Sequence, residues 1–193
     1  VRNYPRFVSA GYDIVASNKV GNTISYDFYA SLRRLLKQKG KTFLYETNVG
    51  AGLPLVDTIR QLHHSGDKIR RIRGVFSGTL SYIFNHFSEE DKDFYTILRE
   101  AMERGYTEPD PREDLCGNDV ARKLLILARE IDLKSEFSDI AIENLIPESL
   151  RTGSVEDFLS SGDYLNEYYA ARKASLAPDE VLRYVGDLDA VTG

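Results

Sequence analysis

A polar run between Gly105 and Lys123 holds the side chains in this sequence that are best suited to chemistry. Within it, Glu108, Asp114 and Asp119 supply carboxylates, and Lys123 supplies an ammonium group. Carboxylates accept hydrogen bonds from an ammonium group, and a lysine can give or take a proton as a general acid or base. The set therefore suits a small zwitterionic substrate better than a polymer or a nucleotide.

The same residues also have a purely structural explanation. Asp119 and Lys123 stand four residues apart, so they share a helical face, where an exposed ion pair contributes only about 0.3–0.5 kcal/mol. Glu108 and Asp114 can serve as loop and capping residues, and Cys116 suits packing better than nucleophilic chemistry. Spacing alone leaves both explanations open.

Strand and helix patterns at the start of the chain predict an α/β scaffold. A strand, a helix and a second strand are expected at 13–17, 22–39 and 42–47, with Asn22 or Thr23 as the helix cap. Lys19 follows the first strand, and ligands bind at the carboxyl ends of strands in such sheets. A solvated lysine ahead of a helix is the alternative.

The rest of the chain alternates between further helices and strands. Helices are expected to open at Pro54, Ser77 and Asp93, then at Asn118 or Asp114, and to cover 155–159 and 164–175, whereas strands are expected at 68–76, 140–146 and 181–188. Gly105 suits the left-handed residue that ends a helix. Ser77 and Thr79 are candidates both for helix caps and for substrate contacts.

A glycine-rich turn, Asn48-Val-Gly-Ala-Gly-Leu-Pro54, follows the second strand. The turn does not match a dinucleotide-binding motif, because Leu55 stands where the third glycine would fall, and it lacks the lysine of a phosphate loop. Two interpretations stay open, namely an ion or ligand site built from backbone groups and a simple tight turn.

Composition narrows the class of protein. The 193 residues are 42% hydrophobic and 28% charged, which is typical of a soluble globular domain, and the net charge of −5 argues against nucleic-acid binding. No apolar run reaches the roughly 20 residues that a membrane span requires. The single cysteine excludes a disulfide framework and a cysteine-based zinc site. We therefore expect a cytoplasmic protein that contacts neither a membrane nor nucleic acid.

Four motifs resemble those of homoserine dehydrogenases in order and spacing, and the resemblance covers nearly the whole chain. They are Ser17–Lys19, Glu46–Pro54, Phe76–Phe84 and Gly105–Lys123. Leu124–Arg129 and Val181–Gly186 resemble the form of this family that is fused to an aspartate kinase. The resemblance implies an α/β (α+β) fold with a mixed sheet covered by helices. It implies the tail end of a Rossmann-type NAD(P)-binding domain at 1–45 and a C-terminally truncated catalytic and dimerisation domain at 46–193.

The resemblance also implies an activity, the NAD(P)H-dependent interconversion of L-aspartate 4-semialdehyde and L-homoserine on the route to threonine, methionine and isoleucine. By analogy, Lys123 transfers the proton, and Lys19 is a second active-site lysine near cofactor and substrate. The other implied site residues fall into three groups. They are Glu108, Asp114, Asp119 and Thr79 for the substrate, Gly105 for a backbone contact to the cofactor, and Glu46, Val49, Ala51 and Leu53 for a monovalent cation such as Na⁺.

Assembly and completeness are further expectations. The resemblance implies NADP in preference to NAD, and a homodimer or higher homo-oligomer. The chain contains no Gly-x-Gly-x-x-Gly turn, so most of the cofactor site is expected outside it and the chain alone is expected to be inactive. The alternatives are a non-catalytic dimerisation fragment and a related NAD(P)-dependent oxidoreductase that acts on another amino-acid aldehyde.

Overall fold

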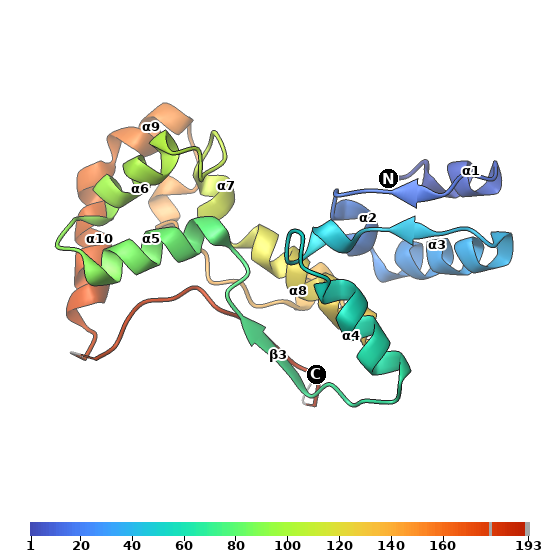
Figure 1. The fold of residues 1–193 in the computed structure, drawn as a ribbon. Helices are drawn as coiled ribbons and strands as arrows, with labels where there is room; N and C mark the ends of the chain where they lie inside the picture. Colours follow the sequence, from blue (N-terminus) through green and yellow to red (C-terminus); the bar gives the residue numbers. More distant parts are fainter. Residues whose placement is uncertain (178, 192–193) are drawn as a thin grey trace. The chain divides into compact units, whose positions relative to one another are not determined.

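The computed structural model describes residues 1–177 and 179–191 (Figure 1). The chain divides into two compact units. We call them the N-terminal unit, made of residues 1–76, 120–141 and 186–191, and the helical unit, made of residues 77–119 and the described part of 142–185.

The N-terminal unit combines helices with short strands. In chain order its elements are α1 (Tyr4–Ser9), β1 (Ile14–Val15), α2 (Val20–Thr23), α3 (Tyr26–Lys39), β2 (Phe43–Leu44), η1 (Glu46–Asn48), α4 (Leu55–His64), β3 (Arg71–Gly74), most of α8 (Asn118–Glu130), η2 (Phe137–Asp139) and β4 (Gly186–Asp189).

The strands of this unit form two separate pairs. β1 and β2 are parallel, with Ile14 opposite Phe43, which confirms the predicted strand–helix–strand opening (Figure 1). β3 and β4 are antiparallel, with Arg71 opposite Asp189. The α/β class is therefore confirmed, but the described strands form two two-stranded sheets instead of one mixed sheet.

The helix predicted for 22–39 is divided in two. Ile24 ends α2 in an extended conformation, and α3 starts two residues later. Asn22 and Thr23 therefore do not cap the long helix; instead the carboxylate of Glu136 accepts a hydrogen bond from the amide of Tyr26 at 2.7 Å. The predicted end is confirmed, because Gly40 adopts a left-handed conformation with φ of 59°.

One apolar core lies under the helices of the N-terminal unit. Its fully or nearly fully buried members include Val8, Leu32, Leu36, Phe43, Val49, Val56, Ile59, Ile126 and Leu127. A buried polar cluster adjoins it, in which Arg60 donates to the carboxylate of Glu130 at 2.8 Å and to the hydroxyl of Tyr45 at 2.9 Å. Burial raises the pKa of Tyr45, so its hydroxyl stays protonated and donates to Glu130.

The helical unit contains α5 (Gly78–Glu89), α6 (Phe94–Glu103), α7 (Arg112–Leu115), the first two residues of α8, η3 (Glu148–Leu150), α9 (Val155–Ser160) and α10 (Gly162–Ala174). Helix α6 packs against both α5 and α10 (Figure 1). At the centre of their core, the rings of Phe94 and Tyr169 stack with centroids 3.6 Å apart. The predicted helix starts at Ser77 and Asp93 are confirmed, because each side chain accepts an amide hydrogen bond from its helix.

Two strand predictions need correction. Residues 140–146 form no strand, and the amide of Leu145 donates to the carbonyl of Leu115 at 3.0 Å. The strand predicted at 181–188 is confined to β4, which starts only at Gly186. In the first segment the apolar pattern reflects burial of Leu145 and Ile146, whereas Val181 and Val185 in the second are exposed. Within 1–177 and 179–191, no helix has the length and apolar character needed to cross a bilayer.

Candidate functional site

The loop that follows α6 is set by Gly105. Its φ is 70°, and the amides of Gly105 and Tyr106 donate to the carbonyls of Met102 and Ala101, each at 2.9 Å. This pattern closes the helix and turns the chain sharply, as predicted. Glu108 follows three residues later, and its side chain is exposed.

Asp114 holds this loop in place. Its carboxylate accepts a hydrogen bond from the amide of Glu108 at 2.8 Å, so the loop folds back onto α7. Asp114 therefore does not cap α8, which was one of the two predicted roles. Nearby, Arg112 pairs with Asp110 at 2.7 Å, and the hydrogen bonds from its guanidinium hold the pKa of Asp110 below its usual range. Pro109 and Pro111 restrict the backbone of this acidic loop further, in addition to these two contacts.

Thr79 connects the start of α5 to the same loop. Its hydroxyl donates to the carbonyl of Tyr106, and the Tyr106 ring meets the Tyr82 ring edge-on with centroids 5.0 Å apart. Ser77 takes the capping role, because its hydroxyl accepts from the amide of Leu80 at 3.1 Å. Within the helical unit, Thr79 thus lies beside the loop that carries Glu108.

Asp119 lies exposed in the first turn of α8, and its position depends on the turn before it. Gly117 there has a φ of 77°, and a Cβ atom added to it would lie 2.0 Å from the hydroxyl oxygen of Tyr184. That hydroxyl donates to the carbonyl of Glu143 at 2.9 Å, and burial raises the pKa of Tyr184. Glycine is required here both for its backbone conformation and for the space that the tyrosine fills.

Lys123 is half-buried in α8. Its Nζ donates a hydrogen bond at 2.7 Å to the carbonyl of Phe76, which lies two residues after the end of β3. The same helix buries an apolar face, since Val120 and Leu124 are both at most 8% exposed. The ammonium group thus lies at the rim of the apolar face, fixed in direction by a backbone carbonyl.

Lys19 is the residue that precedes α2, and its side chain is half-buried. It lies four residues after the end of β1, at the carboxyl end of the strand, as predicted. Its carbonyl accepts from the hydroxyl of Thr23 at 3.1 Å and from the amide of Asn22 at 3.0 Å. Asn22 and Thr23 thus stabilise the lysine segment instead of capping α3.

The glycine-rich turn carries three of the four residues predicted to hold a cation, and the fourth, Glu46, lies two residues before it. The Glu46 carboxylate accepts from the amides of Val56 at 2.8 Å and Asp57 at 3.0 Å, so it caps α4. Gly50 and Ala51 are both left-handed, with φ of 83° and 53°. A left-handed alanine is strained, and such strain collects at ligand-binding turns.

The chemistry of this turn fits a hard cation. Of the other predicted ligands, Val49 is fully buried and Leu53 is 68% exposed, and both offer backbone carbonyl oxygens. Carbonyl oxygens beside a single carboxylate are the ligands that hard cations take in proteins. Among the described residues no group of three or more His, Cys, Asp or Glu side chains is arranged to hold a metal ion.

The predicted site residues fall into two sets. Lys19, Glu46, Val49, Ala51, Leu53 and Lys123 belong to the N-terminal unit, whereas Thr79, Gly105, Glu108, Asp114 and Asp119 belong to the helical unit. The sequence did not predict four residues that make hydrogen bonds to these residues or to segments near them, namely Tyr106, Tyr184, Asn48 and Arg122. These residues follow no periodic pattern, so the sequence held no signal for their partners.

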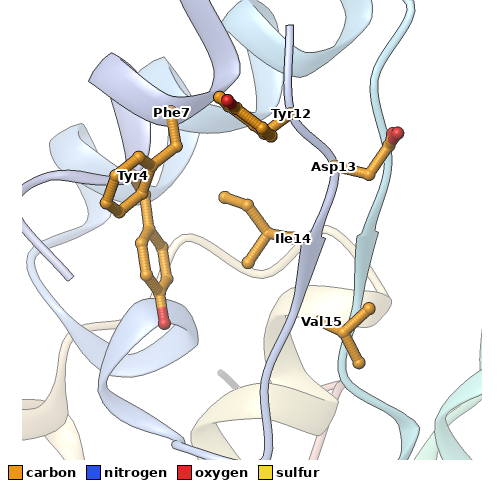
Figure 2. Close-up of a pocket in the computed structure, with 6 residues that line it drawn as sticks. All are labelled: Tyr4, Phe7, Tyr12, Asp13, Ile14 and Val15. Atoms are coloured by element: carbon orange, nitrogen blue, oxygen red, sulfur yellow. The ribbon is translucent and has the colours of Figure 1, made fainter. Parts of the chain in front are cut away.

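A pocket on the N-terminal unit lies apart from the predicted set (Figure 2). It is lined by Tyr4, Phe7, Tyr12, Asp13, Ile14 and Val15, and Figure 2 shows Ile14 facing Tyr4 while Val15 points to the opposite side of β1. The Asp13 carboxylate is occupied by Thr42, whose amide donates at 2.8 Å. A second pocket between α6 and α10 is lined by Phe87, Lys92, Phe94, Asn166 and Lys173 among others. Neither contains a predicted site residue.

Comparisons with known proteins place this chain in a family. The chain is 46% identical over 191 residues to bifunctional aspartokinase/homoserine dehydrogenase 2, chloroplastic, of Zea mays, which covers 98% of this chain and 21% of that protein. The chain thus spans about a fifth of the length of this relative.

Solved structures agree with the fold. A Candida auris protein of unknown function superposes with a TM-score of 0.90 at 36% identity, over 97% of this chain and 55% of that chain. A hyperthermophilic archaeal homoserine dehydrogenase in complex with NADPH superposes with a TM-score of 0.58 at 29% identity, over 66% of this chain and 38% of that chain. The family model described as homoserine dehydrogenase matches residues 54–192. The chain therefore belongs to the homoserine dehydrogenase family.

Proposed function

We propose that this chain is the substrate-binding and catalytic region of an NAD(P)-dependent homoserine dehydrogenase, which interconverts L-aspartate 4-semialdehyde and L-homoserine for threonine, methionine and isoleucine synthesis. The observation that carries the proposal is the family match over residues 54–192, which contains the acidic loop and Lys123. The folded state of that loop supports it, because Asp114 holds the backbone at Glu108.

The site residues would have two kinds of role, which are proton transfer and binding of the amino-acid substrate. Lys123 would give or take the proton at the substrate oxygen, and Lys19 would assist beside it. Glu108 and Asp119 would accept hydrogen bonds from the substrate ammonium group. Thr79 would contribute a hydroxyl near the same loop.

NAD(P)H would supply or accept the hydride when bound. The archaeal neighbour has NADPH bound, which supports an NAD(P) cofactor. That NADP is preferred over NAD is our expectation from the family resemblance. Lys19 and the backbone of Gly105 are the contacts that we propose for it. The backbone oxygens of Val49, Ala51 and Leu53, with Glu46, would hold a monovalent cation such as Na⁺.

Organisation and assembly complete the proposal. Residues 1–45 would be the end of a nucleotide-binding domain, and residues 46–193 would form the catalytic and dimerisation domain of a homodimer or higher homo-oligomer. The name of the Zea mays relative supports a fused aspartate kinase. A cytoplasmic location stays a prediction.

The test is an assay of the full-length gene product with homoserine and NADP, following the absorbance of the reduced cofactor. Lys123→Ala should lower turnover by about 10²–10⁴-fold, the range for loss of a general acid–base group. Its circular dichroism spectrum should match that of the wild type, which separates lost chemistry from lost folding. A variant with normal turnover would contradict the role of Lys123.

Two alternatives predict different outcomes in the same assay. A non-catalytic dimerisation fragment would form a dimer on size exclusion and bind homoserine, but would show no turnover. An oxidoreductase for another amino-acid aldehyde would turn over a different hydroxy amino acid faster than homoserine. Assaying the 193-residue chain beside the full-length gene product also tests the expectation that the chain alone is inactive.

A further inference from the structure

The segment that carries Lys19 has few backbone hydrogen bonds of its own. It lies between β1, which has two residues, and α2, which has four, so residues 16–19 belong to neither a strand nor a helix. A short irregular segment keeps one conformation only when other parts of the protein hold it, because fixing each residue costs about 1–2 kcal/mol of entropy.

Asn48 holds the segment at its beginning. Its side-chain amide donates to the carbonyl of Ala16 at 3.1 Å and to the carbonyl of Ser17 at 2.8 Å. Asn48 is fully buried, with an exposed fraction of 0%. One buried amide bonded to two successive carbonyls fixes both the position and the direction of the chain.

The orientation of Asn48 is itself determined by a row of hydrogen-bonded side chains, the half-buried Arg33 and the buried Asn22. The guanidinium of Arg33 donates to Oδ1 of Asn22 at 2.8 Å, and Nδ2 of Asn22 donates to Oδ1 of Asn48 at 2.9 Å. Because a guanidinium only donates, the oxygen of Asn22 must face Arg33. The Nδ2 of Asn22 then faces Asn48, whose oxygen must accept from it. The Nδ2 of Asn48 is thereby directed at the lysine segment.

Thr23 holds the segment at its end. Its hydroxyl donates to the carbonyl of Lys19 at 3.1 Å and accepts from the guanidinium of Arg122 at 2.8 Å. Thr23 is 5% exposed. Arg122 precedes Lys123 in α8, so these two hydrogen bonds connect the backbone of one proposed catalytic lysine to the helix that carries the other.

We propose that Asn48 and Thr23 are positioning residues, which hold residues 16–19 and thereby direct the Lys19 side chain for the reaction. The inference rests on the proposed function for the role of Lys19. The hydrogen bonds that hold the backbone of residues 16–19, however, do not depend on that function, and their effect on backbone protection can be measured separately.

The first experiment is amide hydrogen exchange on the 193-residue chain, read by mass spectrometry on peptides that cover residues 14–24. Thr23→Val has the same shape but loses the hydroxyl, and we expect exchange in these peptides to quicken by about 5-fold, the effect of one lost hydrogen bond. Thr23→Ser restores the hydroxyl and should exchange like the wild type. Asn48→Leu should quicken the same peptides.

Tyr45→Phe is the matched control, because it removes a buried hydroxyl from the same unit without a contact to residues 16–19. It should leave exchange in the 14–24 peptides unchanged relative to the rest of the unit. Wild-type exchange in these peptides for both Thr23→Val and Asn48→Leu would overturn the inference. Equal quickening by Tyr45→Phe would overturn it as well, because the effect would then be general loosening.

The second experiment is a double-mutant cycle on turnover in the full-length gene product, with Lys19→Ala. Thr23→Val should lower kcat/KM by about 5- to 10-fold, Thr23→Ser should restore it, and Thr23→Val should cause no further loss when Lys19 is already alanine. Equal losses in both backgrounds would overturn the inference. Wild-type turnover in Lys19→Ala would overturn the role of Lys19 and with it the catalytic part of the inference. Absence of turnover in the wild type would contradict the proposed function, and hydrogen exchange would then decide on the positioning.

Discussion

The backbone amide of Glu108 donates a hydrogen bond to the carboxylate of Asp114 at 2.8 Å. We propose that Glu108 binds the substrate. The contact connects this residue to Asp114 in α7, six residues further along the chain. A charged acceptor on a backbone amide forms one of the stronger kinds of hydrogen bond in proteins. Asp114 therefore holds the backbone of the loop that carries Glu108.

Asp114→Ala should raise the KM for homoserine by about 10-fold or more, because a hydrogen bond to a charged group contributes about 1.5–3 kcal/mol. Asp114→Asn keeps an acceptor oxygen and should fall between this variant and the wild type. Steady-state kinetics in the full-length gene product measure both. Glu113→Gln is the control, since Glu113 is an exposed neighbour in the same turn. A KM for Asp114→Ala equal to that of this control would show that the loop does not need the contact.

Gly117→Ala should strongly destabilise the protein. The added Cβ would lie 2.0 Å from the Tyr184 hydroxyl oxygen and would sit on a backbone with φ of 77°. A left-handed alanine costs about 1–2 kcal/mol, and the overlap adds about 1–3 kcal/mol more. Urea unfolding measures the loss. Tyr184→Phe removes the overlapping oxygen, so Gly117→Ala should cost less in that background; equal costs would exclude the tyrosine as the cause.

Apolar periodicity predicted the helices well, because one buried face repeats along each of them. In α8, for example, Val120 and Leu124 stand four residues apart on one helical face, and both are buried. Gly105 was likewise predicted to end a helix, because a left-handed terminal residue is usually glycine. These features depend on neighbouring residues, so the local sequence is enough to predict them.

Strand lengths and the break after Thr23 were not predictable in this way. A strand needs a partner, and residues 140–146 have an apolar pattern without a ladder. The break between α2 and α3 depends on Glu136, which caps the amide of Tyr26 from 110 residues away. The hydrogen bonds from Asn48 to Ala16 and Ser17 likewise join residues that are far apart in the sequence. For the candidate site, spacing left a structural explanation open, and resemblance was needed to choose the residues.

The ion pair of Asp110 and Arg112 should make stability depend on pH in the acid range. Hydrogen bonds from Arg112 lower the pKa of Asp110 in the folded state. The contribution is therefore complete above the ordinary aspartate pKa of about 3.9, and it is lost as pH falls through the lower folded value. The free energy of unfolding of the wild type should exceed that of Asp110→Asn near neutrality. The difference should shrink below about pH 4. A constant difference across that range would contradict the assignment.

Ala51→Gly should leave stability unchanged or raise it slightly. The left-handed alanine, with φ of 53°, is strained by about 1–2 kcal/mol, which roughly offsets the extra freedom that glycine gives the unfolded chain. Ala170→Gly, at an exposed position inside α10, is the control and should cost about 0.5–1 kcal/mol. Thermal or urea unfolding compares the two. A loss in Ala51→Gly as large as in the control would show that the turn is not strained.

Na⁺ should stabilise the folded protein if the turn from Glu46 to Leu53 holds a cation. A ligand that binds only the folded state stabilises it by about 1.4 kcal/mol at ten times its Kd, so Tm should rise with NaCl. Choline chloride at the same ionic strength should not reproduce the rise, because choline is too large for a site of carbonyl oxygens. Glu46→Gln keeps an acceptor for the amides of Val56 and Asp57 but removes the charge, and it should weaken the response to Na⁺. Equal melting curves in the two salts would contradict the proposed cation site while leaving the roles of the lysines untouched.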